Sequence, residues 1–239
     1  MSENVLTVDR RTFVLAAGLA GASLLAGCSS QDNEVEPEPQ SAPADEPEES
    51  GQDELQAQGA QAEGGDPSAA KALVVFYSRA DENYADGGME VLEVGHTKVM
   101  AGYIVEALDA DQYEIVPAEA YPFSYDECCD VASDELAADA RPELAGDLPD
   151  VAPYDTVFVG CPIWWGNEPM VVRTFLEKVD LSGKVVVPFT THGGSGLGSV
   201  PANLQARIPN ATFQDGKAVA GTAVDGARDE VVQWAMSCV

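Results

Sequence analysis

The segment DTVFVGCPIWWG, residues 155–166, decides the fold of this chain. Its first part, Asp155–Pro162, is an almost continuous apolar run, which is typical of a strand covered on both faces of a sheet. Its second part is a loop with two adjacent tryptophans. Pro169 then begins a predicted helix at a favoured first-turn position, and this helix runs to about Val179. The segment therefore predicts a strand, a loop and a helix in direct succession.

The same alternation extends over the chain from Lys71 onward. Predicted strands are residues 71–77, 112–117, 155–162, 184–190 and 217–221, and predicted helices are residues 97–108, 124–140, 169–179, 200–208 and 225–237. Strands that alternate with helices favour βαβ units and a parallel sheet. We expect an α/β three-layer sandwich, in which helices cover both faces of a five-stranded parallel sheet with the order 2-1-3-4-5.

Composition divides the 239 residues into three parts. Residues 1–28 are balanced at two acids and two bases, and residues 29–70 hold 12 acids, no base and no aromatic residue. A segment of the second kind buries too little apolar surface to offset its conformational entropy, so we expect a disordered acidic linker. Of the 29 net negative charges, 17 then fall on the folded domain, residues 71–239. Such a surface repels nucleic acid, which excludes that class of partner.

The first 28 residues are typical of an export signal. Two arginines precede an apolar stretch, Phe13–Gly27, which is too short to span a bilayer. Leu25–Cys28 resembles a bacterial lipobox, which implies that Cys28 is lipidated and becomes the mature N-terminus. Arg10–Phe13 resembles a twin-arginine signal. We expect a protein anchored by lipid alone to the extracytoplasmic face of the cell membrane; a plain signal peptide and an uncleaved anchor stay open as alternatives.

Three loops at the carboxyl ends of predicted strands are the candidate site, because open parallel sheets bind ligands there. They are Ser78–Ala80 with Gly95–Lys98, Cys161–Asn167, and Thr190–Gly198. The first has hydroxyls and a helix start, which suit an anion. The second has the tryptophan pair, of which at least one ring should face the crevice. The third is rich in glycine, which lets backbone approach a flat ring closely.

These three loops resemble the flavin-contacting loops of flavodoxins, and the likeness covers essentially all of residues 71–239. It is closest to flavodoxin-like proteins with a long insertion in the phosphate loop, here Asp81–Val94. The resemblance implies flavin mononucleotide (FMN) as cofactor. It assigns phosphate contacts to Ser78, Arg79, Gly95, His96 and Thr97, and ring contacts to Pro162, Ile163, Trp164, Trp165, Gly166, Thr191, His192, Gly193, Gly194 and Ser195. The chain differs from the family at His96, where Asn is frequent.

Several of these residues also have ordinary structural interpretations. The only two histidines, His96 and His192, can be ordinary polar residues of loops without a role in binding. One tryptophan ring can simply pack on the next helix. No thiol or carboxylate stands at ligand spacing from the histidines, so we expect no metal site. Cys128, Cys129, Cys161 and Cys238 allow three disulfide connectivities, and sequence does not choose among them. Arg141, which precedes a proline, either ends a helix or contacts a substrate.

The resemblance leaves three functions open. The first is an FMN protein that transfers electrons at the membrane, with a redox protein or a small-molecule acceptor as partner. The second is an FMN-dependent reductase of quinones or similar small molecules, in which the insertion shapes a substrate pocket. The third is a surface lipoprotein that keeps the fold without flavin and binds a partner. No nucleophile or acid–base constellation is visible, which favours electron transfer.

Overall fold

The computed structural model describes residues 71–85 and 88–239. The predicted signal peptide, lipidation site and acidic linker lie outside the described residues. Within those residues, no helix combines the length and the apolar character needed to cross a membrane.

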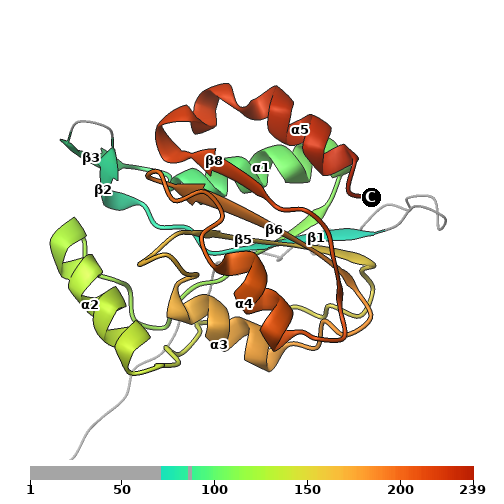
Figure 1. The fold of residues 1–239 in the computed structure, drawn as a ribbon, viewed down its shortest axis with the longest axis horizontal. Coiled ribbons are helices and arrows are strands. Elements are labelled where there is room, and N and C mark those ends of the chain that lie inside the picture. Colours follow the sequence, from blue (N-terminus) through green and yellow to red (C-terminus); the bar gives the residue numbers. More distant parts are fainter. Residues whose placement is uncertain (1–70, 86–87) are drawn as a thin grey trace, which may run out of the picture. The chain divides into compact units, whose positions relative to one another are not determined.

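A parallel sheet forms the middle layer of the domain (Figure 1). Its strands are β1 (Ala72–Phe76), β4 (Asp111–Glu114), β5 (Thr156–Pro162), β6 (Val185–His192), β7 (Thr212–Phe213) and β8 (Lys217–Ala220). The order is β4-β1-β5-β6, followed by β7 and β8, which both pair with β6. The predicted order 2-1-3-4-5 is thereby confirmed, with β7 and β8 sharing the fifth position.

The fifth position differs from the single strand that we predicted at residues 217–221. Phe213 of β7 pairs with Val186, and Lys217 of β8 pairs with Phe189, so residues 214–216 lie opposite only residues 187–188 of β6. The fifth position thus has one residue more than β6 over this stretch, and an extra residue of this kind interrupts the hydrogen-bond ladder and bends the strand. Pro188 lies in the gap and has no N–H to donate, which accounts for a break at this point.

Helices cover both faces of the sheet. They are α1 (His96–Leu108), α2 (Tyr125–Ala137), α3 (Met170–Lys178), α4 (Val200–Arg207) and α5 (Arg228–Met236), with a 3₁₀ helix at Gly221–Gly226 before α5. In Figure 1, α1 and α5 lie over one face and α3 and α4 over the other. All five helices were predicted to within a few residues, except that the last one is divided by the 3₁₀ turn.

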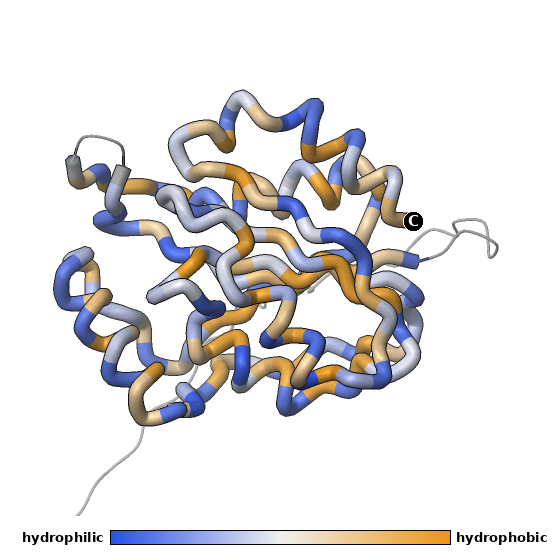
Figure 2. Tube along the Cα trace, in the orientation of Figure 1, coloured by the Kyte–Doolittle hydropathy of each residue, from blue (hydrophilic) through white to orange (hydrophobic). Residues whose placement is uncertain are grey.

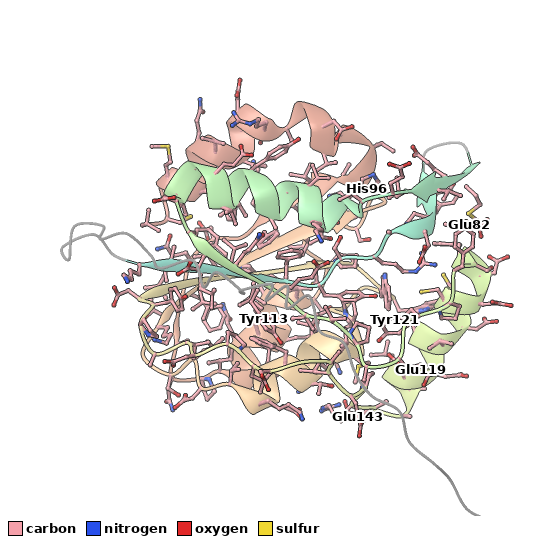
Figure 3. All side chains as sticks on the ribbon, turned by 180° about the vertical axis from the view of Figure 1, so that it is seen from behind. Glu82, His96, Tyr113, Glu119, Tyr121 and Glu143 are labelled. Atoms are coloured by element: carbon pink, nitrogen blue, oxygen red, sulfur yellow. The ribbon has the colours of Figure 1, made fainter. Side chains whose placement is uncertain are left out.

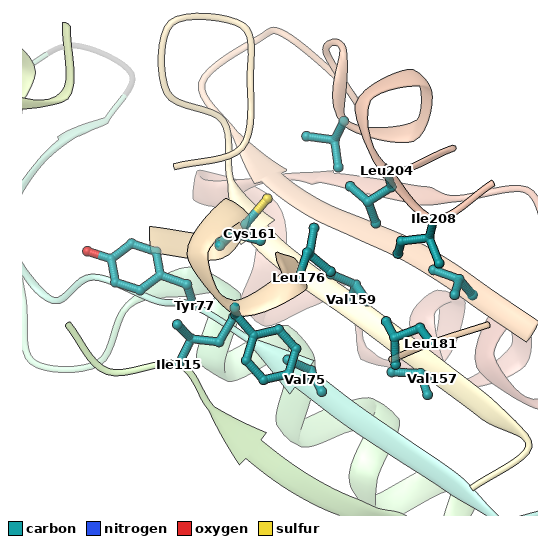
Figure 4. Packing of buried hydrophobic residues seen from close by; sticks show 14 of the residues in the cluster. Val75, Tyr77, Ile115, Val157, Val159, Cys161, Leu176, Leu181, Leu204 and Ile208 are labelled. Atoms are coloured by element: carbon teal, nitrogen blue, oxygen red, sulfur yellow. The ribbon is translucent and has the colours of Figure 1, made fainter. Parts of the chain in front are cut away.

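Two apolar clusters, one on each face of the sheet, hold the layers together. Figure 4 shows the cluster on the face covered by α3 and α4, which includes Val157 and Val159 of β5, Leu176 of α3 and Leu204 of α4. The other cluster joins α1 and α5 to the opposite face. The hydropathy colouring of Figure 2 shows the same pattern, with apolar strands between helices of mixed character. Each fully buried side chain of this kind contributes about 1.5–3 kcal/mol through removal of apolar area from water.

A β-hairpin precedes α1 and lies outside the main sheet. It pairs β2 (Asp81–Ala85) with β3 (Gly88–Leu92) in antiparallel register. We predicted this segment only as an inserted loop. Its sequence signal is the dipeptide at positions 86 and 87, Asp-Gly, which is a strong marker of a two-residue hairpin turn.

Candidate functional site

One cavity of about 680 Å³ lies at the carboxyl ends of the central strands. Its lining residues come from the loop after β1, the start of α1, the loops after β5 and β6, the end of β8, the hairpin and α2. They are Arg79, Asn83, Tyr84, His96, Thr97, Tyr125, Asp126, Cys128, Cys129, Ala132, Pro162, Ile163, Trp164, Trp165, Thr191, His192, Gly193, Gly194, Ser195, Ala220, Gly221 and Thr222. The volume is that of a typical cofactor site.

Twelve of the fifteen residues predicted to contact the cofactor line this cavity. The other three, Ser78, Gly95 and Gly166, are not among the lining residues and adjoin them in the sequence. Ser78 Oγ accepts a hydrogen bond from the Lys98 backbone N–H at 3.0 Å. A Cβ at position 95 would collide with Ser78 Oγ and the Arg79 carbonyl, so this close approach requires glycine. Contact between these fifteen residues and a cofactor stays a prediction.

The start of α1 provides the polar end of the cavity. The first N–H groups of a helix have no intrahelical acceptor and therefore suit an anion. Thr97 is buried, and its hydroxyl lies 2.7 Å from the hydroxyl of Thr191 at the end of β6. This bond fixes the helix start against the central sheet. Figure 3 shows His96 at the hairpin end of α1.

Both histidines of the cavity favour their neutral form. Burial lowers the pKa of His96 below its ordinary value of 6.5, although Glu90 and Asp225 act in the opposite direction. Burial likewise lowers the pKa of His192. The Nδ1 atom of His192 accepts a hydrogen bond from the Gly194 backbone N–H at 2.8 Å, which fixes the glycine-rich loop locally. The histidines therefore act as hydrogen-bonding groups at neutral pH, and not as cations.

The tryptophan pair forms a tight turn that places its two rings differently. Trp165 has φ = 49° and Gly166 has φ = 77°, while Trp164 and Asn167 exchange two backbone hydrogen bonds of 2.9 Å. The Trp164 ring packs edge-on against Tyr121, with centroids 4.8 Å apart. The Trp165 ring is 59% exposed at the cavity, and its Nε1 donates to the Cys129 carbonyl at 3.0 Å. Trp165 is therefore the ring available for stacking.

A buried polar cluster supports this turn from below. The Glu168 carboxylate is buried and accepts from Arg173 Nε at 2.6 Å. Asn203 Nδ2, from α4, donates both to Glu168 Oε2 at 2.8 Å and to Asn167 Oδ1 at 3.0 Å. The backbone N–H of Ser199 donates to the Gly166 carbonyl at 2.8 Å. The loops after β5 and β6 are thereby fixed to each other and to α3 and α4.

Arg79 connects the phosphate loop to the remaining side of the cavity. Its guanidinium is buried and donates to the backbone carbonyls of Glu82, Pro122 and Phe123 at 2.5–2.7 Å. Its Nε is buried without a partner among the described residues. A phosphate contact from Arg79 stays a prediction, and Nε is the donor left for it. Glu82 strengthens the same connection, because its carboxylate accepts from the Tyr125 N–H at the start of α2 (Figure 3).

Sequence reasoning missed the side of the cavity formed by the hairpin and α2. Its residues are Asn83, Tyr84, Tyr125, Asp126 and Cys129, which we call the outer wall. The loops after β5 and β6, residues 162–166 and 191–195, are called the inner wall. The outer wall joins segments some 40 positions apart, so no local pattern reveals it.

The structure also answers two questions that the sequence leaves open. All four described cysteines are free, so none of the three disulfide connectivities is present among residues 71–85 and 88–239. Arg141 lies away from the cavity lining and binds Asp139 and Glu177, at 2.9 and 2.7 Å. It therefore links the end of α2 to α3.

These observations define a doubly wound α/β domain with a cofactor-sized cavity at its strand ends. The chain belongs to the flavodoxin family, whose model, described as Flavodoxin, matches residues 92–237. A comparison with curated proteins gives no match.

Solved structures of three bacterial proteins resemble the chain. A candidate flavoprotein of Bacteroides uniformis is 30% identical with a TM-score of 0.55, over 69% of this chain and 97% of that one. One of Bacteroides eggerthii is 28% identical with a TM-score of 0.53, over 68% and 98%. A flavoprotein of Lactobacillus acidophilus, solved in complex with FMN, is 21% identical with a TM-score of 0.50, over 66% and 98%. The last likeness concerns the fold.

Proposed function

We propose that this chain is an FMN-binding flavoprotein that transfers electrons at the extracytoplasmic face of the membrane. The observation that carries the proposal is the convergence of three predicted flavin loops on one cavity. Family membership and the FMN complex of the Lactobacillus protein support the choice of cofactor. When bound, FMN supplies reversible electron transfer, and the protein supplies binding and electrostatics.

The residues of the cavity fit FMN at both ends. The polar end has the start of α1, the Thr97 hydroxyl and the orphaned Nε of Arg79, which are donors suited to a phosphate. The other end has the exposed Trp165 ring for stacking. Gly193 and Gly194 also border open space, because a Cβ at either position would meet no atom within 4 Å. A flat ring can therefore approach this backbone closely.

Electron transfer agrees with the charge around the cavity. Asp126 lines it, and the folded domain carries a large negative charge. Negative charge near a flavin disfavours the further negative charge that reduction adds, so we expect a low reduction potential.

The visible absorption spectrum of the purified full chain, produced with flavin available, tests the cofactor. We expect a flavin spectrum, with the released cofactor identified as FMN by mass. A colourless protein that also takes up no added FMN would refute the proposal. It would leave a protein that uses the flavodoxin fold to bind a partner.

The membrane location is the second part of the proposal and rests on the sequence of the first 28 residues. We expect the mature N-terminus to be a lipid-modified Cys28, and the protein to fractionate with membranes. Mass spectrometry of the N-terminal peptide checks the modification, and Cys28→Ala should move the protein to the soluble fraction. A mature N-terminus elsewhere would refute the lipid anchor without affecting the cofactor proposal.

A further inference from the structure

We propose that the outer wall forms a subsite for an uncharged, planar aromatic electron acceptor of the quinone class. This inference rests on the proposed function, since it requires an electron source in the same cavity. The outer wall is separate from the three loops that suffice for the cofactor, and it brings residues of the hairpin and α2 to the same cavity. Of its residues, only Asp126 has a role in the cofactor site described above, through its charge.

Aromatic rings dominate this subsite. Tyr84 of β2 and Tyr125 of α2 have centroids 6.2 Å apart at 37°, and Tyr84 is 54% exposed. The Trp165 indole reaches toward them from the inner wall and bonds to the Cys129 carbonyl of α2. Three rings from three separate elements thus border one opening. Exposed aromatic faces at a cavity favour a flat aromatic ligand through stacking and loss of apolar area.

The charges of the cavity select against anionic ligands. Among the described lining residues, Arg79 is the only lysine or arginine, and its buried guanidinium is committed to backbone carbonyls of the hairpin and of the segment before α2. The two histidines favour the neutral form. Asp126 adds a carboxylate to the outer wall. A ligand with phosphate or sulfonate groups finds repulsion here, whereas an uncharged ring does not.

Tyr125 can hydrogen-bond to a carbonyl oxygen of such a ligand. Burial, chiefly, raises the pKa of its hydroxyl to about 12, so the hydroxyl stays protonated and can act as a donor at neutral pH. In the reaction, the quinone gains two electrons and two protons, and its two C=O groups become C–OH groups. The reduced flavin loses two electrons and two protons and returns to its oxidised form. An external reductant, here dithionite, restores the reduced flavin.

Equilibrium dialysis of the oxidised, FMN-loaded full chain tests binding independently of turnover. The probes are 2-(hydroxymethyl)anthraquinone, which is uncharged, and anthraquinone-2-sulfonate, which has the same rings and one negative charge. We expect the uncharged probe to bind at least about 10-fold more tightly, a difference of about 1.4 kcal/mol, because like charges brought together in a confined site repel. Asp126→Lys should reduce the ratio of the two affinities, because it replaces a repulsive charge by an attractive one and so strengthens binding of the sulfonate.

Variants of the outer wall locate the subsite. Tyr84→Ala and Tyr125→Ala should each weaken binding of the uncharged probe about 2- to 10-fold, the range expected for loss of one aromatic contact. Tyr125→Phe should keep most of the affinity but slow the oxidation of dithionite-reduced protein by the probe. Phe123→Ala is the matched control, because this ring is 57% exposed, lies two residues from Tyr125 and does not line the cavity.

The outcomes separate this inference from the function beneath it. A chain that takes up no FMN refutes the proposed function. An FMN-loaded chain that binds both probes equally, or neither, refutes the subsite and leaves the flavoprotein intact. The subsite is also refuted if Tyr84→Ala and Tyr125→Ala bind as the unchanged chain does, or if Phe123→Ala weakens binding as much as they do.

Discussion

The inner and outer walls of the same cavity are built in different ways. The loops after β5 and β6 form the inner wall, and buried groups support it. One of these groups is Glu168, whose exposed fraction is 1%. The outer wall consists of half-buried and exposed residues on a two-stranded hairpin and the start of α2, joined to the domain through Arg79 and Glu82. Local stability follows the density of buried contacts. The difference indicates that the inner wall is rigid and suits a cofactor, whereas the outer wall can adjust its conformation to a second ligand.

The largest effect should come from breaking the support of the inner wall. Arg173→Met leaves the buried Glu168 carboxylate without its hydrogen-bonded cationic partner, with Arg207 Nε remaining at 3.8 Å, which costs about 3–5 kcal/mol of unfolding free energy. Urea unfolding measures this. The exposed pair of Arg228 with Glu106 is the control, and Arg228→Ala should lower the unfolding free energy far less, because solvent screens this pair. If Arg173→Met costs no more than Arg228→Ala, the inner wall is not held by its buried charges.

A second variant sharpens that result. The double variant Glu168→Met with Arg173→Met removes the carboxylate that the single variant leaves unpaired. The double variant should therefore lose clearly less unfolding free energy than Arg173→Met alone. A double variant as unstable as the single one would mean that packing, and not charge, determines the cost.

The outer wall should respond locally where the inner wall responds globally. Arg79→Met removes the side-chain donor from the carbonyls of Glu82, Pro122 and Phe123, of which Phe123 keeps only the Glu82 N–H, and we expect this to cost about 1–3 kcal/mol. Hydrogen exchange should accelerate in β2, β3 and the first turn of α2, with α3 and β5 unchanged. Uniform acceleration over the whole domain would contradict the idea of a separately attached wall.

The sequence predicted the inner wall because its determinants are local. A buried strand such as residues 155–162 is legible as an apolar run, and parallel topology brings the loops that follow such strands to one edge. The break in the fifth strand was not predicted, since it depends on Pro188 of a neighbouring strand lying opposite residues 214–216.

The outer wall could be predicted only in part. The Asp-Gly dipeptide at positions 86 and 87 is a hairpin signal that we did not use. The docking of that hairpin against the start of α2 has no sequence signal, because it depends on Arg79 and Glu82, which bind backbone groups about 40 residues away. Backbone carbonyls are present at every residue, so the partner of Arg79 cannot be identified from residue types.

A smaller effect, on FMN affinity, should show whether the position of the inner wall matters for binding apart from the stability of the domain. Asn203→Ala removes both bonds to the Trp165 turn, at Asn167 and Glu168, while leaving Arg173 in place. We expect FMN to bind about 5- to 30-fold more weakly, which corresponds to the loss of about 1–2 kcal/mol of positioning. Titration of apoprotein with FMN measures this. Gln205→Ala, on the exposed side of the same helix, is the control, and equal losses in both variants would remove the special role of Asn203.

The smallest effect concerns pH and the start of α1, which lines the same cavity. His96 packs at the start of α1, where burial lowers its pKa in spite of Glu90 and Asp225. The unfolded chain therefore takes up a proton near pH 6.5 while the folded chain does not, so stability is complete above pH 6.5 and falls as the pH drops toward the folded pKa. His96→Asn should reduce this loss between about pH 7.5 and 5.5 by less than about 1 kcal/mol, because the group is only half-buried and its charges are screened. His192 retains a similar dependence, since burial lowers its pKa too, so the double variant should be flatter still. Urea midpoints at the two pH values test this, and a steeper loss in His96→Asn would mean that Glu90 and Asp225 outweigh burial and that His96 is a cation facing the cavity.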